Sequence, residues 1–378
     1  MKLLQQKFLD SVTSLSRVAL SVGFDRQIFA FQPRGGISRY FAELIYGLNF
    51  CNDVTASCAF RFHRNVHLHE QGLENVQSNK FLRLLPKIGG LCKSRSESLH
   101  GYDIVHATFT SGSPYRLKNS KLVCSLFDMI PERYPLLFSR RNPHLNKREW
   151  FEHADLILSI SNSAADDLEF FQPQLTTPIK VIHLGTSIHK VMPRFPHEIN
   201  FPFLLFVGKR VFYKNFQILL IALSRLPLKS RPHLICAGGQ PFGLQELKIL
   251  NKLQLYNHVH QFSATDFELA WLYRNAQALL VPSMAEGFSL PLIEAFACNT
   301  PVICSDIEVH REVGGEFASF LPGLNGNAWA DCLRTLSIES LTRPRQALGD
   351  NQYLKLLEYY SQARLSMEHS LAYHLLLG

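Results

Sequence analysis

The chain has 378 residues, which is long for one hydrophobic core and suits two domains of roughly 150 to 200 residues each. Hydrophobic residues make up 46% and charged residues 19%, an ordinary globular composition that excludes a disordered chain. The formal net charge of +8 favours anionic partners such as nucleotide diphosphates or acidic lipid headgroups. No nucleic-acid-binding motif accompanies this charge, so we do not expect nucleic acid as a partner.

The cysteines and the apolar runs bear on the compartment. The eight cysteines include no Cys-x-x-Cys pair and mostly lie in apolar stretches. Buried thiols in a reducing cytosol explain this pattern better than disulfides or a zinc site. No apolar run approaches the ~20 residues of a membrane-spanning helix. We therefore expect a cytoplasmic protein.

Two segments combine basic with aliphatic side chains. Residues 1–17 place their leucine and phenylalanine side chains roughly on one helical face and their basic side chains outside it. This pattern fits either a membrane-surface helix or an extra helix packed on the first domain. Residues 80–95 fit an anionic bilayer and an ordinary helix with a solvated face equally well.

The first predicted strand is Val18–Val22. The apolar segment Gln27–Phe31 either continues it or forms a neighbouring strand, and a helix is expected from Ser38 to Leu48. Gly35 and Gly36 precede this helix, where the absence of Cβ atoms lets the backbone approach a ligand at the carboxyl end of a sheet. Taken alone, a glycine pair also fits a simple turn.

Three more strands are predicted in the first half, at Asp103–Ala107, Leu122–Phe127 and Leu156–Ile160. Ser161 follows the last of these and is expected to cap the next helix. The proline-containing segment 185–202 then indicates a linker between domains.

The second half opens with a predicted strand, Phe203–Gly208. Arg210 and Lys214 follow it in a loop, with Asn215 as the expected cap of the next helix. A planar guanidinium and a mobile ammonium together suit a diphosphate, although two isolated cations are more often plain surface charges. The remaining predicted strands are Leu234–Ala237, Val259–Phe262, Ala278–Val281 and Pro301–Cys304, and the helices are Asp266–Asn275 and Asp350–Leu377.

Residues 281–305 hold the strongest candidate site. Ser289 is a candidate N-cap of a helix that begins in the next residues, and a strand, turn and helix start of this kind present backbone N–H groups to a phosphate. Glu286 lies in the loop and Glu294 on the helix, where a carboxylate can accept hydrogen bonds from two adjacent ribose hydroxyls. Two isolated glutamates would ordinarily be solvated surface charges.

Three motifs in order give these patterns more weight. The stretch EGFSLPLIEAFACNTPVI (286–303) resembles the Glu-x7-Glu signature of the family-four retaining glycosyltransferases. The segments QPRGGISRYF (32–41) and VGKRVFYKN (207–215) are similar to the glycine-rich loop of that family and to its second-domain phosphate loop. Any one of the three would be weak evidence, but the ordered set covers most of the chain.

The resemblance implies an α/β fold of the GT-B type, with two facing Rossmann-like domains, parallel sheets and a cleft between them. The expected acceptor-binding domain spans residues 1–190 and the expected nucleotide-sugar domain spans 191–350. Residues 351–378 are expected to form a helix that crosses back to the first domain.

The resemblance also assigns site residues. Glu286 would contact a hydroxyl of the donor sugar, Arg210 and Lys214 would stabilise the departing diphosphate, and Glu294 would bind the ribose. The other donor-binding candidates are Gly35, Gly36, Gly208, Gly287, Phe288, Ser289 and Leu290.

The chain departs from the family pattern at two points. Phe127 replaces a histidine that usually faces the sugar and is followed here by Asp128, a candidate for the sugar face; Ser263 replaces a common glycine. His106 is a second candidate for that face, although a hydrogen-bonded core histidine is the more common situation.

The function implied is that of a retaining, metal-independent hexosyltransferase that uses a nucleoside diphosphate sugar. The acceptor would be a glycan or a lipid-linked glycan of a cell-surface polysaccharide, with peripheral binding to the inner face of the plasma membrane. No cofactor or metal is expected, because the sequence shows no metal-ligand cluster. The alternatives are a degenerate homologue that binds nucleotide or glycan without catalysis, and a phosphorylase or epimerase of the same fold.

Overall fold

The computed structural model describes residues 19–60, 62–63, 65–72, 77–78, 99–138, 146–195, 199–339 and 351–378. Residues 1–17, expected to form a membrane-surface helix or a helix packed on the first domain, and the whole basic segment 80–95 lie outside these ranges. Within the described ranges, no helix combines the length and the apolar character needed to cross a membrane.

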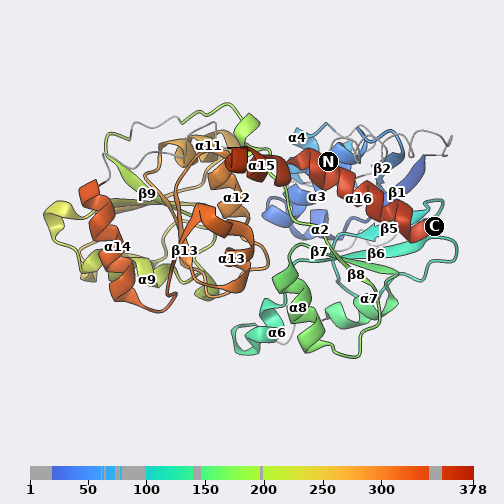
Figure 1. The fold of residues 1–378 in the computed structure, drawn as a ribbon, viewed down its shortest axis with the longest axis horizontal. Coiled ribbons are helices and arrows are strands. Elements are labelled where there is room, and N and C mark those ends of the chain that lie inside the picture. Colours follow the sequence, from blue (N-terminus) through green and yellow to red (C-terminus); the bar gives the residue numbers. More distant parts are fainter. Residues whose placement is uncertain are drawn as a thin grey trace.

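Two six-stranded parallel sheets form the centres of the two halves of the chain, which lie side by side (Figure 1). The sheet of the N-terminal half has the order β2-β1-β5-β6-β7-β8 and that of the C-terminal half has the order β11-β10-β9-β12-β13-β14. The fold class expected from the sequence is confirmed. The strands are β1 Leu20–Phe24, β2 Val54–Cys58, β5 Ile104–Ala107, β6 Lys121–Leu126, β7 Leu156–Ser159, β8 Ile179–Val181, β9 Phe203–Val207, β10 His233–Ala237, β11 Val259–Phe262, β12 Leu279–Val281, β13 Val302–Ser305 and β14 Ala318–Leu321, with a small separate pair, β3 Phe62–His63 and β4 Gln77–Ser78.

Helices cover both sheets and connect successive parallel strands. In the N-terminal half they are α2 Gln27–Phe31, α3 Gly36–Leu48, α4 Val66–Glu70, α6 Ile130–Arg133, α7 Lys147–His153 and α8 Asn162–Phe171. In the C-terminal half they are α9 Phe216–Ser224, α10 Leu244–Lys252, α11 Asp266–Asn275, α12 Leu290–Ala297, α13 Glu308–Gly314 and α14 Gly326–Glu339, and the chain ends with α15 Asn351–Tyr359 and α16 Gln362–Leu377.

Most predicted strands are confirmed to within two residues, but the prediction for Gln27–Phe31 is wrong. This segment forms helix α2 because the buried carboxylate of Asp25 accepts the N–H of Gln27 at 3.1 Å and turns the chain out of the sheet. The strand beside β1 is instead β2. Strands β2, β8 and β14 were not predicted, and each of them lies at an edge of its sheet.

Ser161 caps α8 as predicted, since its side chain accepts the N–H of Ala164. Asn215 and Ser289 occupy the expected positions before α9 and α12, but neither side chain makes a capping hydrogen bond. Both residues have a left-handed backbone, with φ of 51° and 74°, whereas a side-chain cap needs an extended backbone. The Asn215 amide donates to the carbonyl of Gly323 at 2.8 Å instead.

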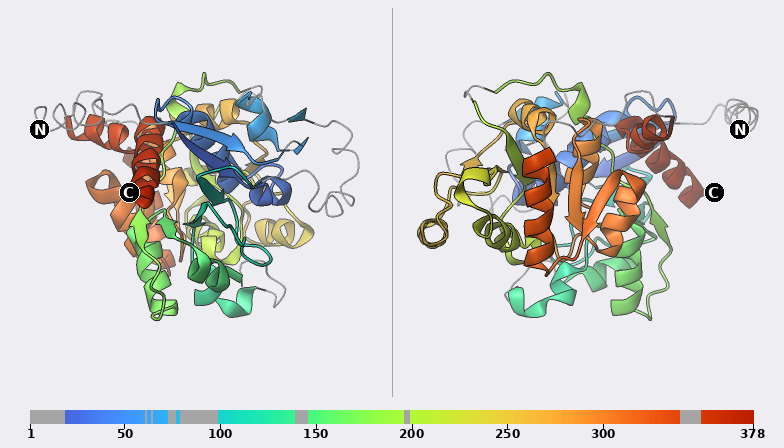
Figure 2. Two further views of the ribbon diagram at one scale, coloured as in Figure 1. Left: turned by 90° about the vertical axis from the view of Figure 1, so that its right-hand side faces the viewer. Right: turned by 60° about the vertical axis from the view of Figure 1, so that its left-hand side comes forward.

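Helix α16 packs on α3 of the N-terminal half, so the two ends of the described chain lie in the same half (Figure 2). The Tyr373 hydroxyl is hydrogen-bonded to Nδ1 of His106 at 2.7 Å. His369 donates through Nδ1 to the carbonyl of Leu365, so its Nε2 accepts from the Tyr40 hydroxyl at 2.8 Å. The last helix therefore reaches the interior of the first half through polar as well as apolar contacts.

We expect the protein to lose stability between pH 6.5 and pH 4. Burial lowers the pKa of His369 from 6.5 to about 4, so in this window the unfolded chain binds a proton that the folded chain does not. The free energy of unfolding should fall by about 2–3 kcal/mol between pH 7 and pH 4. Urea titrations of the wild type and His369→Gln across this range measure the effect. An identical pH dependence in the two proteins would contradict it, and the exposed His153→Gln serves as a control.

Candidate active site

An ion pair joins the loop between β12 and α12 to the loop that follows β9. Nζ of Lys214 donates to both oxygens of Glu286, at 2.5 and 2.7 Å, and the hydroxyl of Ser283 donates to Oε1 at 2.6 Å. The side chains of Lys214 and Glu286 are only 18% and 7% exposed. The structure therefore places one cation and one carboxylate together at the carboxyl end of the C-terminal sheet.

The start of α12 presents a buried hydroxyl. Ser289 is 4% exposed, and its Oγ has no hydrogen-bond partner in the described part of the chain. A buried polar atom without a partner is costly, and this one lies at the positive end of a helix dipole. An anionic ligand such as a phosphate would satisfy both features.

Glu294, one turn into α12, is almost completely buried at 3% exposure. Its Oε2 accepts from the Tyr273 hydroxyl at 2.8 Å and its Oε1 accepts from Nη1 of Arg39 at 3.3 Å. Burial raises the pKa of Glu294, while the Arg39 guanidinium and the Tyr273 hydroxyl act against that rise. The carboxylate is thus held by one residue from each half.

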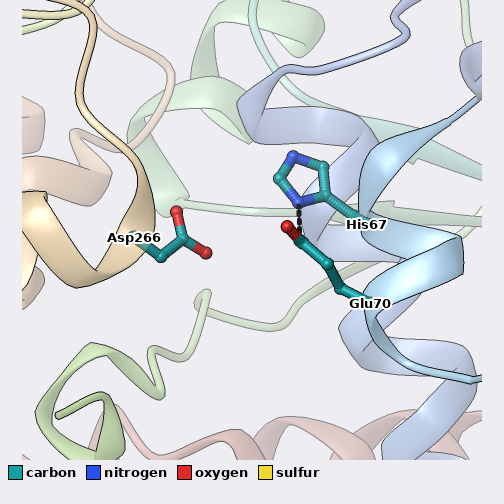
Figure 3. Close-up of side chains that lie close together, drawn as sticks. All are labelled: His67, Glu70 and Asp266. Carbon is teal, nitrogen blue, oxygen red and sulfur yellow. Dashed lines mark hydrogen bonds and ion pairs between the residues drawn. The ribbon is translucent and has the colours of Figure 1, made fainter.

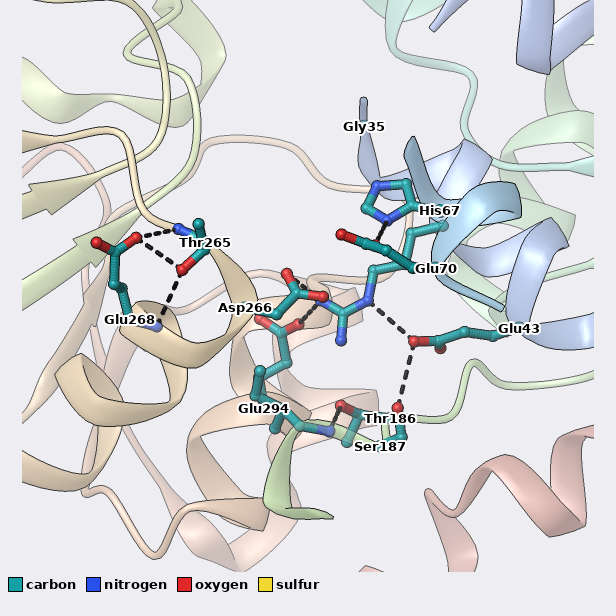
Figure 4. A network of polar contacts seen from close by, with 12 residues as sticks. Gly35, Glu43, His67, Glu70, Thr186, Ser187, Thr265, Asp266, Glu268 and Glu294 are labelled. Carbon is teal, nitrogen blue, oxygen red and sulfur yellow. Dashed lines mark hydrogen bonds and ion pairs between the residues drawn. The ribbon is translucent and has the colours of Figure 1, made fainter. Parts of the chain in front are cut away.

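Arg39 was missed by the sequence analysis. It lies on the first turn of α3, where its N–H donates to the carbonyl of Gly35, and its guanidinium also pairs with Glu43 at 3.0 Å and Asp266 at 3.7 Å. Figure 4 shows these carboxylates facing one another across the junction of the halves. The sequence feature that could have identified Arg39 is its position three residues after Gly36, inside the glycine-rich motif.

Arg210 and Lys214 pair with different carboxylates. The guanidinium of Arg210 pairs with Glu246 at 2.6 Å, donates to the carbonyl of Gln240 and lies over the ring of Phe242. Its Nη1 is buried and has no hydrogen-bond partner among the described residues. The two cations of the phosphate loop are therefore neutralised separately, by different carboxylates.

Gly287 brings the loop against the N-terminal half. A Cβ on Gly287 would lie 1.7 Å from the carbonyl oxygen of Phe127 and 3.1 Å from Cβ of Asp128. The hydroxyl of Ser161 donates to the carbonyl of Gly287 at 2.6 Å. Asp128 thus lies beside the loop as well, and only glycine permits this approach.

A second contact joins the halves beside this one. The carboxylate of Glu312 on α13 accepts the N–H groups of Asn162 and Ser163 at the start of α8, at 2.7 and 3.0 Å. His183 is hydrogen-bonded to the same carboxylate at 2.6 Å and to the Tyr359 hydroxyl at 2.8 Å. A carboxylate from one half therefore satisfies the helix start of the other.

The remaining candidates are more remote. His106 is completely buried, with its ring nitrogens hydrogen-bonded to Tyr373 and Ser125, as in the core alternative. Gly35 and Gly36 begin α3 one turn before Arg39. Gly208 directly follows β9 and has a φ of 127°, a conformation that favours glycine.

One small cavity lies at the candidate site, and a larger pocket lies elsewhere in the C-terminal half. A cavity of about 10 Å³, close to the size of one water molecule, lies between the halves and is lined by residues that include Arg39, Leu290 and Glu294. A pocket of about 540 Å³ lies along β11 and α10 and is lined by Phe242, Tyr256 and other residues. The larger pocket contains no predicted site residue, so we place the chemistry between the halves.

Comparison with known proteins agrees with this geometry. Residues 190–353 match the model of the glycosyl transferases group 1 family. This region makes up less than half of the chain. The matched region includes Lys214, Glu286 and Glu294.

Two curated proteins illustrate the similarity. A D-inositol 3-phosphate glycosyltransferase of Corynebacterium jeikeium is 28% identical over 243 residues, which cover 58% of this chain and 57% of the relative. An O-antigen chain mannosyltransferase of Salmonella typhimurium is 35% identical over 104 residues, which cover 27% of this chain and 30% of the relative. The match thus spans little more than half of the first relative and less than a third of the second.

Similarity to solved structures extends over most of the chain. A sucrose-phosphate synthase from Thermosynechococcus elongatus superposes with a TM-score of 0.69 at 17% identity, covering 95% of this chain and 99% of the other. At this identity the similarity shows the fold, which is GT-B.

Proposed function

We propose that the protein is a retaining glycosyltransferase that moves a hexose from a nucleoside diphosphate sugar to a hydroxyl group of an acceptor. The observation that carries the proposal is the combination of the Lys214–Glu286 pair with the buried hydroxyl of Ser289 at the start of α12. Together they supply a cation, a sugar-binding carboxylate and an anion-binding helix start within one loop region.

Each site residue has its own role in the proposed transfer. Negative charge develops on the diphosphate as it leaves, and Lys214 with the amides of Phe288, Ser289 and Leu290 stabilises that charge. Glu286 accepts from a hydroxyl of the sugar, and Glu294 accepts from the ribose hydroxyls. Arg210 joins the diphosphate by exchanging its carboxylate partner Glu246 for phosphate oxygens.

The configuration at the anomeric carbon is retained by attack from the face that the diphosphate leaves. No carboxylate of the N-terminal half was identified from the sequence as a nucleophile, and this favours a front-face reaction. In it, an oxygen of the departing phosphate helps to deprotonate the acceptor hydroxyl. The charge stabilisation comes from side chains and amides, without a metal ion.

We infer a glycan or lipid-linked glycan acceptor in cell-surface polysaccharide synthesis, with the enzyme in the cytoplasm or peripherally on the inner membrane face. The O-antigen mannosyltransferase among the relatives supports this setting, since that protein acts on such a chain. The net charge of +8 is consistent with an anionic surface and an anionic donor.

A thermal-shift panel of UDP, GDP, ADP and their sugars tests the proposal. A ligand at 100 times its Kd adds ~2.7 kcal/mol to the free energy of unfolding, so the correct nucleotide should raise the Tm of the wild type. In Glu294→Gln the shift should largely disappear, because the amide replaces one ribose acceptor by a donor. Glu149→Gln, on the exposed face of α7, is the matched control.

The outcomes separate the alternatives. If none of these nucleotides stabilises the wild type, the proposal fails. Stabilisation by a nucleotide without sugar transfer would favour a non-catalytic homologue. Phe127 motivates this alternative, because it replaces the histidine that usually faces the sugar. A reaction that requires inorganic phosphate would indicate a phosphorylase.

A further inference from the structure

A histidine and two carboxylates meet at the junction of the halves, outside the proposed donor site. His67 and Glu70 lie one turn apart on α4, and Asp266 comes from the start of α11 in the other half (Figure 3). One ligating atom of each lies within 4.8 Å of the others. Nδ1 of His67 is hydrogen-bonded to Oε2 of Glu70 at 3.2 Å, a separation close to that of adjacent ligands that share an ion at about 2.1 Å.

The two helices that carry these side chains, α4 and α11, are each held by hydrogen bonds at their first turn. The side chain of Asn65 caps α4 by accepting the N–H of Leu68 and donates to the carbonyl of Gln32, which ties α4 to the glycine-rich loop. Thr265 and Glu268 form a capping box that fixes the first turn of α11, where Asp266 lies. The three ligating groups are thus held on rigid elements rather than on long loops.

The charge at the junction is unbalanced. Around Arg39, the described structure places the carboxylates of Glu43, Asp266 and Glu294, and Glu70 lies next to them (Figure 4). One guanidinium therefore pairs with three carboxylates, and a fourth lies close to Asp266.

We propose that His67, Glu70 and Asp266 bind one divalent transition-metal ion between the two halves of the chain. A nitrogen ligand combined with two carboxylates suits Zn²⁺ or Mn²⁺ better than Mg²⁺, which prefers oxygen ligands and retains its waters. Nη1 of Arg39 lies 3.7 Å from Oδ1 of Asp266, which is beyond hydrogen-bonding distance, so this ion pair leaves the carboxylate able to bind an ion.

The ion would have a structural role. Because two ligands come from α4 and the third from α11, the ion binds both halves at once and favours the arrangement in which they meet. It would also offset part of the repulsion between the carboxylates around Arg39. This inference does not depend on the proposed sugar transfer, and it leaves the transfer chemistry to side chains.

Equilibrium dialysis of EDTA-treated full-length protein against Zn²⁺ or Mn²⁺, with metal counted by mass spectrometry, tests the site in the absence of nucleotide. We expect one ion per chain and a rise in Tm of roughly 3–6 °C at saturation. His67→Ala and Asp266→Asn should each weaken binding at least ~10-fold, and Asp266→Asn retains the size of the side chain.

The controls address other histidines. His153→Ala removes an exposed imidazole and should leave binding unchanged. His233→Ala tests a separate pair of histidines, in which Nδ1 of His233 lies 3.0 Å from Nε2 of His260. Absence of stoichiometric binding, loss of binding only in His233→Ala, or wild-type binding in Asp266→Asn would each overturn the proposal.

Discussion

Lys214→Ala should lower the turnover number of sugar transfer by about 10²- to 10³-fold. The ammonium of Lys214 is largely buried beside the proposed sugar site, and it donates to both oxygens of Glu286. Its removal takes away a preorganised positive charge at the place where the leaving diphosphate becomes more negative. Steady-state kinetics with the donor identified by the nucleotide panel provide the measurement.

Stability needs a separate check in this variant. Removing one partner of a poorly exposed pair leaves Glu286 without its cation, and this costs up to about 3 kcal/mol in the free energy of unfolding. Urea unfolding shows whether the variant remains folded under assay conditions. Lys209→Ala, an exposed lysine in the same loop, should retain activity. Undiminished turnover of folded Lys214→Ala would show that the assignment is wrong.

Gly287→Ala should separate the two halves and reduce transfer on the order of 10²-fold. The added Cβ would lie 1.7 Å from the carbonyl oxygen of Phe127, an overlap that no rotation of a side chain can relieve. The loop must therefore withdraw from β6, and the Ser161 hydrogen bond to Gly287 is lost. An increased radius of gyration in small-angle scattering, together with the loss of transfer, measures the effect.

Gly243→Ala is the matched control for this steric argument. Its Cβ would meet only Glu246 Oε2 at 3.8 Å, an ordinary contact, and its φ of −73° suits alanine. This variant should keep the radius of gyration and the activity of the wild type. If Gly287→Ala also keeps both, the contact with Phe127 does not control the approach of the halves.

The candidate site shows how far sequence reasoning extends. The turn between β12 and α12 was predicted because its strand, proline and apolar helix face are all local signals. The conformation of Ser289 was not predicted, since a left-handed backbone depends on what surrounds the loop. Likewise α2 was mistaken for a strand because its five residues carry the same apolar pattern in either conformation.

The amino-acid sequence by itself determined two parallel α/β halves and the local elements that carry Lys214, Glu286 and Glu294, because periodicity, caps and motif spacing act over short distances along the chain. Only the tertiary structure decided the pairings between halves. Arg39 and Glu294 are 255 residues apart in sequence, and His67 and Asp266 are similarly distant. Which charges meet depends on how two packed sheets lie against each other, and no local pattern contains that information.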